Sequence, residues 1–422
     1  MNIIIRSARI VDPNSSHNGK TADILVKNGS IDSIRTRITG VSKAHEIVAE
    51  NLHVSPGWVD IGAFLGDPGF EFKEDITSGS KAAAAGGYTH VCCLPNTNPT
   101  LHSKSEVEYV KAKSKGNVVS ITPLGALSLN CAGQEITEMY DMHAVGINAF
   151  TDGLGQSFNA GFMQRSLQYV KPFNGLVISF PNDRSIAGSG TMNEGPISTL
   201  LGLKGIPALA EELAIKRDLQ LAEYTDSRIH FAGISTSESV RLIADAKDRG
   251  VKVTCSVAIH NLIFDDTELT EYDSNFKLMP PLRSREEVDA ICKALADGQI
   301  DAIHSAHLPQ HAESKITEFD HAEYGAISFE SAFGLANKAL KKHIRINKLV
   351  DKLAVQPRNI IGMDCPLIER NQKAELTLFD PSEKWVFSEN NIQSKSKNTS
   401  VIKRDLVGKP LGIINNSQLY LN

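Results

Sequence analysis

The sequence predicts an α/β protein, a TIM-type (β/α)8 barrel joined to a small β-sandwich domain that is built from both ends of the chain. Over about 300 residues, short apolar runs alternate with helical segments, which is typical of parallel βαβ units. The first ~50 residues and the stretch after about residue 370 contain short β-branched runs instead. A chain of 422 residues is long enough to bury one large core and a smaller one.

Buried parallel strands read as continuous apolar runs, and this chain has such runs at the spacing that a barrel needs. Eight of them favour a closed barrel over an open sheet: WVDIGAF (58–64), THVCCLP (89–95), VVSITPLGAL (118–127), VGINAFT (145–151), GLVISF (175–180), RIHFAGIS (228–235), VKVTCSVAI (251–259) and IDAIHSA (300–306). Between them, three segments carry apolar residues at helical spacing, namely 211–224, 236–250 and 284–298. Ser235 or Thr236 is expected to cap the second helix, and Ser284 the third.

The predicted domains follow from this pattern. Residues 54–366 are expected to form the barrel, and residues 1–53 with 367–422 a composite β-rich domain. The KNG sequence at 27–29 predicts a hairpin turn, because Asn-Gly tolerates positive φ. The polar stretch SENNIQSKSKNTS (388–400) predicts a surface loop.

Composition excludes several classes of function. A net charge of −5 and a pI near 6.2 give no electrostatic reason to expect binding to nucleic acid or to an anionic membrane. No stretch approaches the ~18 uninterrupted apolar residues of a spanning helix. The N-terminus enters a strand-like pattern without a signal-peptide layout, and the six cysteines lack CxxC spacing. We therefore expect a cytoplasmic protein with reduced, buried thiols.

The stretch DIGAFLGDPG (60–69) raises a question about chemistry. It follows an apolar strand, and the carboxyl end of a barrel strand is where barrel enzymes present their reactive groups. Beyond Asp60, however, its only titratable residue is Asp67.

Longer stretches identify a resemblance. Residues 55–99, which end in the PNTNP loop, resemble the N-terminal signature of bacterial dihydroorotases, members of the metal-dependent amidohydrolase superfamily. The likeness continues through MNEGPISTLLGLKG, HFAGISTSESVRLI, PPLRSREEVDAICKALADGQIDAI and AELTLFDPSEKW. The resemblance implies a barrel whose mouth holds zinc, which activates a water for hydrolysis or closure of the cyclic amide of dihydroorotate. It also implies an aspartate that shuttles the proton.

In this chain, the positions that match the metal ligands of the family hold residues that cannot coordinate a metal. The paired histidines of the first strand fall on Gly62 and Phe64, the bridging carboxylate on Gly153, and two further histidines on Phe180 and Gly233. The catalytic aspartate falls on Ala306, while three other substrate-binding positions hold Gly66, Met279 and Gln310. Because glycine and phenylalanine offer no lone pair, the resemblance here predicts no resident cofactor, although the family uses zinc. We expect Phe64 and Phe180 to fill the emptied cavity.

Part of a substrate pocket is retained by the same comparison. Asn96, Tyr324, Gly325, Arg283 and His260 match family positions. Asn96 is equally well explained as a turn residue, Arg283 as half of a structural ion pair and His260 as a hydrogen-bonded histidine at a strand end.

Three functions remain open at this point. The first is a non-catalytic homologue in pyrimidine biosynthesis that acts as a scaffold, by resemblance for aspartate transcarbamoylase, and that forms a homo-oligomer. The second is an active dihydroorotase or other cyclic-amide hydrolase with a relocated metal on Asp152, His304, His307 and His311, or with acid–base chemistry from Asp67, Asp152 or Asp183. The third is a small-molecule sensor that uses the pocket around Asn96.

Overall fold

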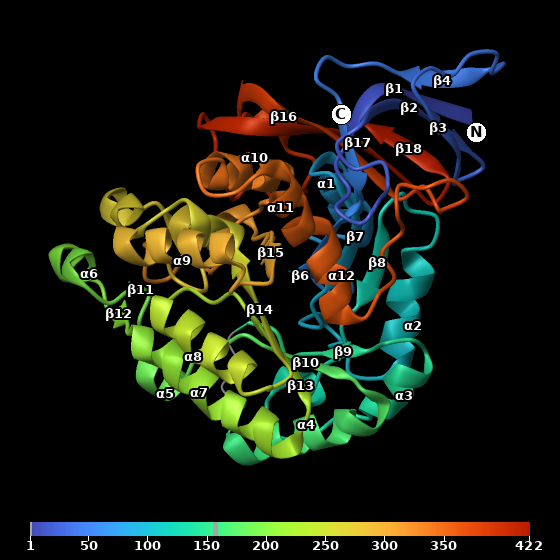
Figure 1. Cartoon of the computed structure of the whole chain (residues 1–422). Helices are drawn as coiled ribbons and strands as arrows, with labels where there is room; N and C mark the ends of the chain where they lie inside the picture. The colour runs from blue at the N-terminus through green and yellow to red at the C-terminus, as the bar shows by residue number, and fades with distance from the viewer. Residues whose placement is uncertain (1, 155–158) are drawn as a thin grey trace.

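The computed structural model describes residues 2–154 and 159–422. It shows a (β/α)8 barrel packed against a β-sandwich domain, with both ends of the chain in that second domain (Figure 1). The predicted fold class is therefore confirmed, and the barrel strands follow from the apolar runs described above.

Eight parallel strands form the barrel within residues 2–154 and 159–422. They are β6 (Trp58–Ala63), β7 (Tyr88–Cys93), β8 (Ser120–Pro123), β9 (Ala149–Phe150), β10 (Leu176–Ser179), β13 (Arg228–Ala232), β14 (Val253–Ala258) and β15 (Ala302–His304). Seven of the eight lie inside a predicted apolar run, and β7 begins one residue before its run, at Tyr88. Strands β6 to β8 pair in order, as do β9, β10, β13, β14 and β15. A bridge between Gly125 and Phe150 joins the two sets, and the Phe64 N–H donates to the His307 carbonyl at 2.9 Å where the ring closes.

Helices cover the outside of these strands (Figure 1). They are α1 (Ile76–Ala85), α2 (Lys104–Lys113), α3 (Met139–Ala144), α4 (Ala160–Val170), α7 (Ala208–Thr225), α8 (Ser237–Asp248), α9 (Arg285–Asp297), α10 (Phe329–Leu340), α11 (Ile346–Val350) and α12 (Gln356–Ile361). A short excursion holds α5 (Arg184–Ala187), β11 (Met192–Asn193), α6 (Pro196–Leu201) and β12 (Gly205–Ile206). Thr236 caps α8 as predicted, by accepting from the Ser239 N–H, whereas Ser284 occupies the cap position of α9 without a side-chain bond.

The second domain is built on one mixed sheet with the strand order β18-β17-β16-β5-β1-β2-β3, in which β4 also pairs with β1. Its strands come from both ends of the sequence: β1 (Asn2–Ile10), β2 (Thr21–Lys27), β3 (Ser30–Arg35), β4 (Ala44–Ile47), β5 (His53–Pro56), β16 (Leu376–Val386), β17 (Asp405–Asn415) and β18 (Gln418–Leu421). The predicted turn joins β2 to β3, with Asn28 and Gly29 both at positive φ. Because β5 straddles residue 53, the domain boundaries themselves stay a prediction.

The polar segment 388–400 differs from its prediction as a surface loop. Ser394, Ser396 and Asn398 are buried, and they alternate with exposed neighbours. Asn398 accepts from the Gln310 N–H at 3.0 Å and donates to the Gly325 carbonyl at 3.1 Å. The segment therefore uses its polar side chains to satisfy backbone groups of the loops at the barrel mouth, a role that composition alone does not reveal.

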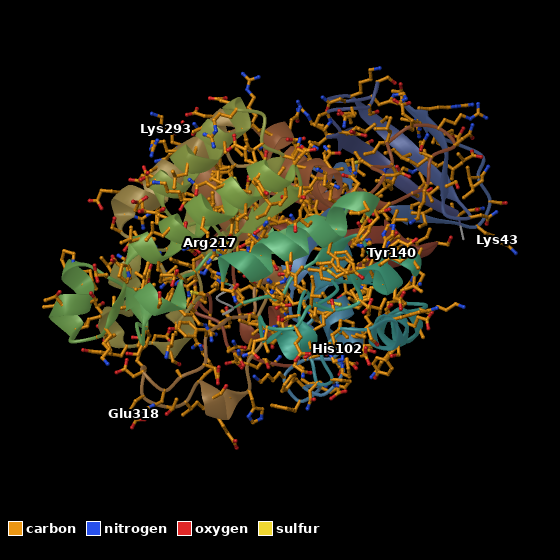
Figure 2. All side chains as sticks on the ribbon, turned by 90° about the horizontal axis from the view of Figure 1, so that it is seen from below. Lys43, His102, Tyr140, Arg217, Lys293 and Glu318 are labelled. Carbon is orange, nitrogen blue, oxygen red and sulfur yellow. The ribbon has the colours of Figure 1, made fainter. Side chains whose placement is uncertain are left out.

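The surface carries the long charged side chains, of which Lys43, Lys293 and Glu318 extend outward in Figure 2. None of the described helices has the length and apolar character to cross a membrane. All six cysteines are unpaired, and five of them are buried, as the sequence predicts.

Candidate functional site

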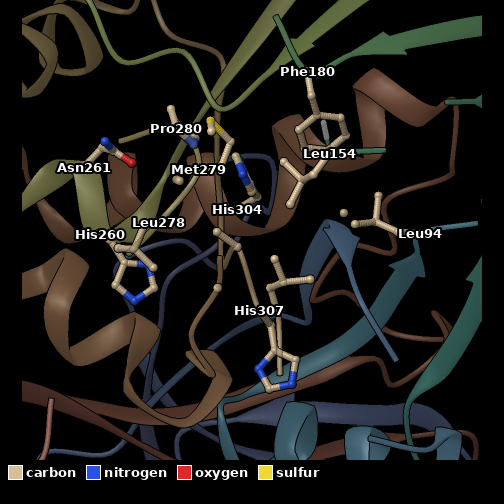
Figure 3. A pocket seen from close by; sticks show the side chains of 15 residues that line it. Leu94, Leu154, Phe180, His260, Asn261, Leu278, Met279, Pro280, His304 and His307 are labelled. Atoms are coloured by element: carbon tan, nitrogen blue, oxygen red, sulfur yellow. The ribbon is translucent and has the colours of Figure 1, made fainter. Parts of the chain in front are cut away.

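The carboxyl ends of the barrel strands surround a cavity of only about 20 Å³. That volume holds about one water molecule. Apolar side chains form much of its wall, and Leu94, Leu154, Phe180 and Met279 gather there beside His304 (Figure 3). The place where a barrel enzyme binds its substrate is thus largely filled by protein.

Phe180 fills the space beside the end of β6. A Cβ atom added to Gly62 would lie 3.5 Å from the tip of the Phe180 ring and 3.9 Å from a methyl group of Leu94. A side chain longer than alanine at position 62 would meet this ring. Phe64, in contrast, does not line the cavity: its ring packs 6.1 Å from that of Phe70. Of the two phenylalanines expected to fill the site, the structure places only Phe180 there.

Gly153 is held against Asn96. The Asn96 Nδ2 donates to the Asp152 carbonyl at 2.8 Å, which places the Asn96 Oδ1 where a Cβ at position 153 would stand. Gly153 also has a φ of +69°, which other residues adopt at a cost. A side chain at position 153 therefore requires the amide of Asn96 to move.

The Asp152 carboxylate points into the preceding loop. It accepts from the Leu127 N–H at 2.7 Å, from the Ser128 N–H at 2.9 Å and from the Ser128 hydroxyl. Burial raises the pKa of Asp152 to about 6 despite these bonds. Because both of its carboxylate oxygens accept these hydrogen bonds, Asp152 stabilises the turn at residues 127–128.

The two remaining positions also lack coordinating groups. Gly233 has a φ of +72°, and a Cβ there would lie 3.0 Å from Pro280. Ala306 has a φ of 55°, an unusual conformation for alanine, which aspartate and asparagine adopt more readily. The backbone at position 306 thus has the conformation that an aspartate would suit, but it carries a methyl group.

Three histidines line the small cavity. A buried ring nitrogen of His260 (Nε2) and of His304 (Nδ1) has no hydrogen-bond partner among the described residues, and that of His307 (Nε2) has only the Glu74 carboxylate at 3.6 Å. Burial, followed by the nearby His304 and His307, lowers the pKa of His260 to about 4. Burial also lowers the pKa of His304, against the charge of Asp60. His260 and His304 are therefore neutral near pH 7.

His307 is fixed as part of the core. Its Nδ1 accepts from the Ser328 N–H at 3.2 Å, its Nε2 lies 3.6 Å from the Glu74 carboxylate, and its ring stacks on Phe329 at 4.1 Å. His311 is instead partly exposed, 3.9 Å from Glu313. The HxxHxxxH spacing of 304–311 does not bring these three side chains to a common point.

The other two carboxylates considered from the sequence have partners elsewhere. Asp67 is buried beneath Lys113, whose Nζ lies 2.7 Å away, and it accepts from Tyr109 at 3.1 Å. Asp183 caps α5 by accepting from the Ser185 N–H at 2.9 Å. Neither lines the barrel cavity.

These residues do not fit a resident zinc ion. Zinc in proteins takes three or four His, Cys or carboxylate ligands at about 2.0–2.3 Å. Among residues 2–154 and 159–422, no three such side chains come together closely enough to hold a metal. The cavity is instead lined by apolar side chains and three histidines. His260 and His304 are neutral, and His307 is held by its contacts in the core.

The remaining predicted pocket residues are separated from one another. Arg283 is buried, where it donates to Ser235 and Asn193 at 3.0 Å and lies 3.6 Å from Glu211, the arrangement of a structural ion pair. Tyr324 lines a wider hollow of about 550 Å³ outside the cavity. Leu154, Met279 and Leu308 line both spaces and form the partition between them.

Gly325 lines the small cavity, and Asn96 lines neither space. Sequence reasoning missed the partition and the role of Leu94. The one available signal was the apolar residue directly after β7, in CCLPN.

Comparisons with known proteins identify the family of this chain. A family description given as "Dihydro-orotase-like" matches residues 52–239. A curated dihydroorotase of Geotalea daltonii is 41% identical over 410 residues, 97% of this chain and 96% of that protein. One of Geobacter metallireducens is 40% identical over 411 residues, with the same coverage.

Solved structures show the same fold at lower identity. A D-hydantoinase superposes with a TM-score of 0.85 at 22% identity, covering 100% of this chain and 95% of the other. The L-hydantoinase of Arthrobacter aurescens superposes with a TM-score of 0.86 at 20% identity, covering 99% and 95%. With full-length relatives at about two residues in five identical, the chain belongs to the dihydroorotase family.

Proposed function

We propose that this chain is a non-catalytic member of the dihydroorotase family that serves pyrimidine biosynthesis through contacts with another protein. One observation carries the proposal: the Phe180 ring occupies the space beside Gly62, at the point where the resemblance expects the first metal ligands. Hydrolysis of a cyclic amide at neutral pH needs an activated water and a proton shuttle. Gly62, Phe180, Gly233 and Ala306 supply neither group.

The pathway comes from the relatives, which are named dihydroorotase over almost the full length of this chain. We propose aspartate transcarbamoylase as the partner, on the family resemblance, together with a homo-oligomeric state and a cytoplasmic location. A large protein with an intact core and a filled site is well suited to a structural role, since its fold does not depend on substrate or metal.

Zinc binding and complex formation test the two parts of this proposal separately. The purified chain is dialysed against excess zinc and then against buffer, beside the Geotalea daltonii relative as a positive control. We expect less than about 0.1 zinc per chain, because a closed site needs three or four ligands. Stoichiometric zinc would contradict the loss of the metal site and would favour the active alternative with a relocated centre.

The partner arm uses the aspartate transcarbamoylase from the same source. We expect co-elution of the two proteins on gel filtration and a rise in transcarbamoylase activity on addition of this chain. Separate elution at micromolar concentrations, with no change in activity, would refute the partner while leaving the zinc result intact.

A further inference from the structure

Another hollow lies at the opposite end of the barrel, where the strands begin. The first residues of three neighbouring strands line it, namely Leu176 of β10, Arg228 of β13 and Val253 of β14, together with Asn359 and Ile360 of α12. Its volume is about 250 Å³, and it shares no lining residue with the barrel cavity. We call it the amino-end pocket. Because barrel enzymes place their chemistry at the carboxyl ends of the strands, this pocket is separate from the barrel mouth.

Arg228 brings a cation with unused donors to this pocket. Its Nη1 donates to the Asn174 carbonyl at 3.2 Å and its Nη2 to the Ile360 carbonyl at 2.8 Å. A guanidinium has five N–H donors, so three remain that bond to no residue that the structure describes. Arg228 is only partly buried, and its unbonded Nε keeps accessible surface. A ligand in the hollow therefore has access to the Nε side of the guanidinium.

The positive charge of Arg228 has no carboxylate partner. Arginine stays protonated at neutral pH, although burial lowers the pKa of Arg228 from its usual value. Within residues 2–154 and 159–422, Arg228 forms no ion pair, and its bonds go to carbonyl groups alone. The other cation of the pocket wall, Lys252, lies 2.6 Å from the Asp226 carboxylate, and the amide of Gln356 donates to Asp351 at 3.1 Å. The nearby carboxylates thus bond to other groups, and the uncompensated charge of the pocket is positive.

Asn359 adds a neutral donor to the same space. Its side chain is exposed, and its amide bonds to no residue in the described parts of the chain. Carboxylate and phosphate oxygens are strong acceptors for a guanidinium, which binds them through two N–H groups at once. A partly buried cation without a counter-ion also carries a cost of desolvation, which a bound anion offsets. The donors and the charge of the pocket therefore favour an oxyanion over a neutral or cationic ligand.

We propose that the amino-end pocket binds the phosphate or carboxylate group of a small molecule through the Arg228 guanidinium and the Asn359 amide. This site is independent of the barrel mouth and of the proposed loss of catalysis. It gives the chain a binding activity that the family relationship does not assign.

The test measures binding of inorganic phosphate and of acetate to the full chain at neutral pH, with sodium chloride keeping the ionic strength constant. Phosphorus NMR line widths follow phosphate, and proton saturation transfer follows acetate. We expect saturable binding of at least one probe, and the tighter of the two identifies which group the pocket takes. R228Q is expected to weaken that probe at least tenfold, because glutamine carries no charge and lacks the guanidinium fork. R249Q, the same change at an exposed arginine that pairs with Glu223, is the matched control and leaves binding unchanged.

Three results would overturn the proposal: no saturation by either probe, an unchanged affinity in R228Q, or an equal loss in R249Q. The first would mean that solvent alone serves the unused donors, and the other two that the anion binds elsewhere on the surface. If R228Q does not fold, as judged by circular dichroism, Asn359→Ala replaces it, with at least a threefold loss expected and an unchanged affinity again contradicting the site.

Discussion

At the scale of single residues, the contact between Gly153 and Asn96 limits which side chains position 153 can carry. The Asn96 amide lies where a side chain at position 153 would begin, and Gly153 has a φ of +69°. A substitution at 153 therefore meets both a backbone cost and a collision. Gly202 has nearly the same φ, +68°, but open space around it, and so separates the two effects.

We expect Gly153→Ala to lower the free energy of unfolding by at least about 2 kcal/mol, and Gly202→Ala by about 1 kcal/mol, the cost of left-handed backbone alone. Adding Asn96→Ala to Gly153→Ala should recover part of the loss, with a coupling energy of about 1 kcal/mol. Urea unfolding of these three variants and of Asn96→Ala alone measures this. Equal losses at 153 and 202, with no coupling to Asn96, would show that the collision does not exist.

Three buried histidines predict how the stability of the folded protein depends on pH. Burial lowers the pKa of His90 to about 4, of His230 to about 3 and of His260 to about 4. An unfolded imidazole titrates near ~6.5. Between these values the unfolded chain binds more protons than the folded one, so stability is lost as the pH falls. Asp152 works in the opposite direction, because its raised pKa of about 6 means that its contribution is lost as the pH rises.

We therefore expect a net loss of stability from pH 7 to pH 5, with about 2 kcal/mol from each of the three histidines and about 1 kcal/mol in the opposite sense from Asp152. His230→Gln should reduce the difference between the two pH values by about 2 kcal/mol, since Thr254 and Ser256 now bond the ring at 2.8 and 2.9 Å in its neutral form. Urea unfolding at both pH values checks this, and an unchanged difference in the variant would refute the assignment.

At the scale of elements, the barrel strands were predictable and the polar segment 388–400 was not. Most barrel strands are buried on both faces, so their sequences are continuous apolar runs that predict strands without knowledge of their neighbours. The KNG turn was also predictable, because an Asn-Gly pair readily adopts the positive φ angles that this turn requires. Ser394, Ser396 and Asn398 have the composition of a solvated loop. Their hydrogen-bond partners lie far away in the sequence: Gln310 and Gly325 for Asn398, and Glu74 and Lys73 for the two serines.

That segment supplies its own test. Asn398→Ala would leave the Gln310 N–H and the Gly325 carbonyl without their present partners, and we expect a loss of about 2 kcal/mol. Lys397→Ala, at the exposed neighbouring position, should change stability by less than about 0.5 kcal/mol. Comparable losses in the two variants, measured by urea unfolding, would mean that the segment is not anchored through Asn398.

The candidate site was predictable only in part, for a physical reason. Residue identity at Gly62, Phe180 and Ala306 already shows that lone pairs are missing, since that is a property of each side chain. Which side chains then occupy the space depends on packing: Phe180 does, whereas Phe64 turns to Phe70. Asp152 looks available in the sequence, and only the structure shows its oxygens bonded to residues 127 and 128.

At the scale of the whole molecule, a buried ion pair ties the barrel to the β domain. Arg358 of α12 is fully buried, pairs with Glu375 beside β16 and donates to the Ala354 carbonyl at 2.7 Å. Arg358→Ala would remove the buried partner of Glu375 and leave it only the half-exposed Lys373 at 3.4 Å and the Thr89 hydroxyl at 3.1 Å, so we expect a loss of about 3 kcal/mol. Arg241→Ala, which breaks exposed pairs with Glu238 and Asp245, should cost less than about 1 kcal/mol. Thermal unfolding would contradict this account if the two variants behaved alike.

At the same scale, the central proposal is that the chain keeps the family fold but lacks the metal ligands and the aspartate at the barrel mouth. The most direct measurement is hydrolysis of dihydroorotate by the purified chain with added zinc, beside the Geotalea daltonii relative under the same conditions. We predict no turnover above the uncatalysed background, because the space beside Gly62 is filled by Phe180 and position 306 carries only a methyl group. Zinc-dependent turnover by this chain at a rate near that of its relative would contradict the account.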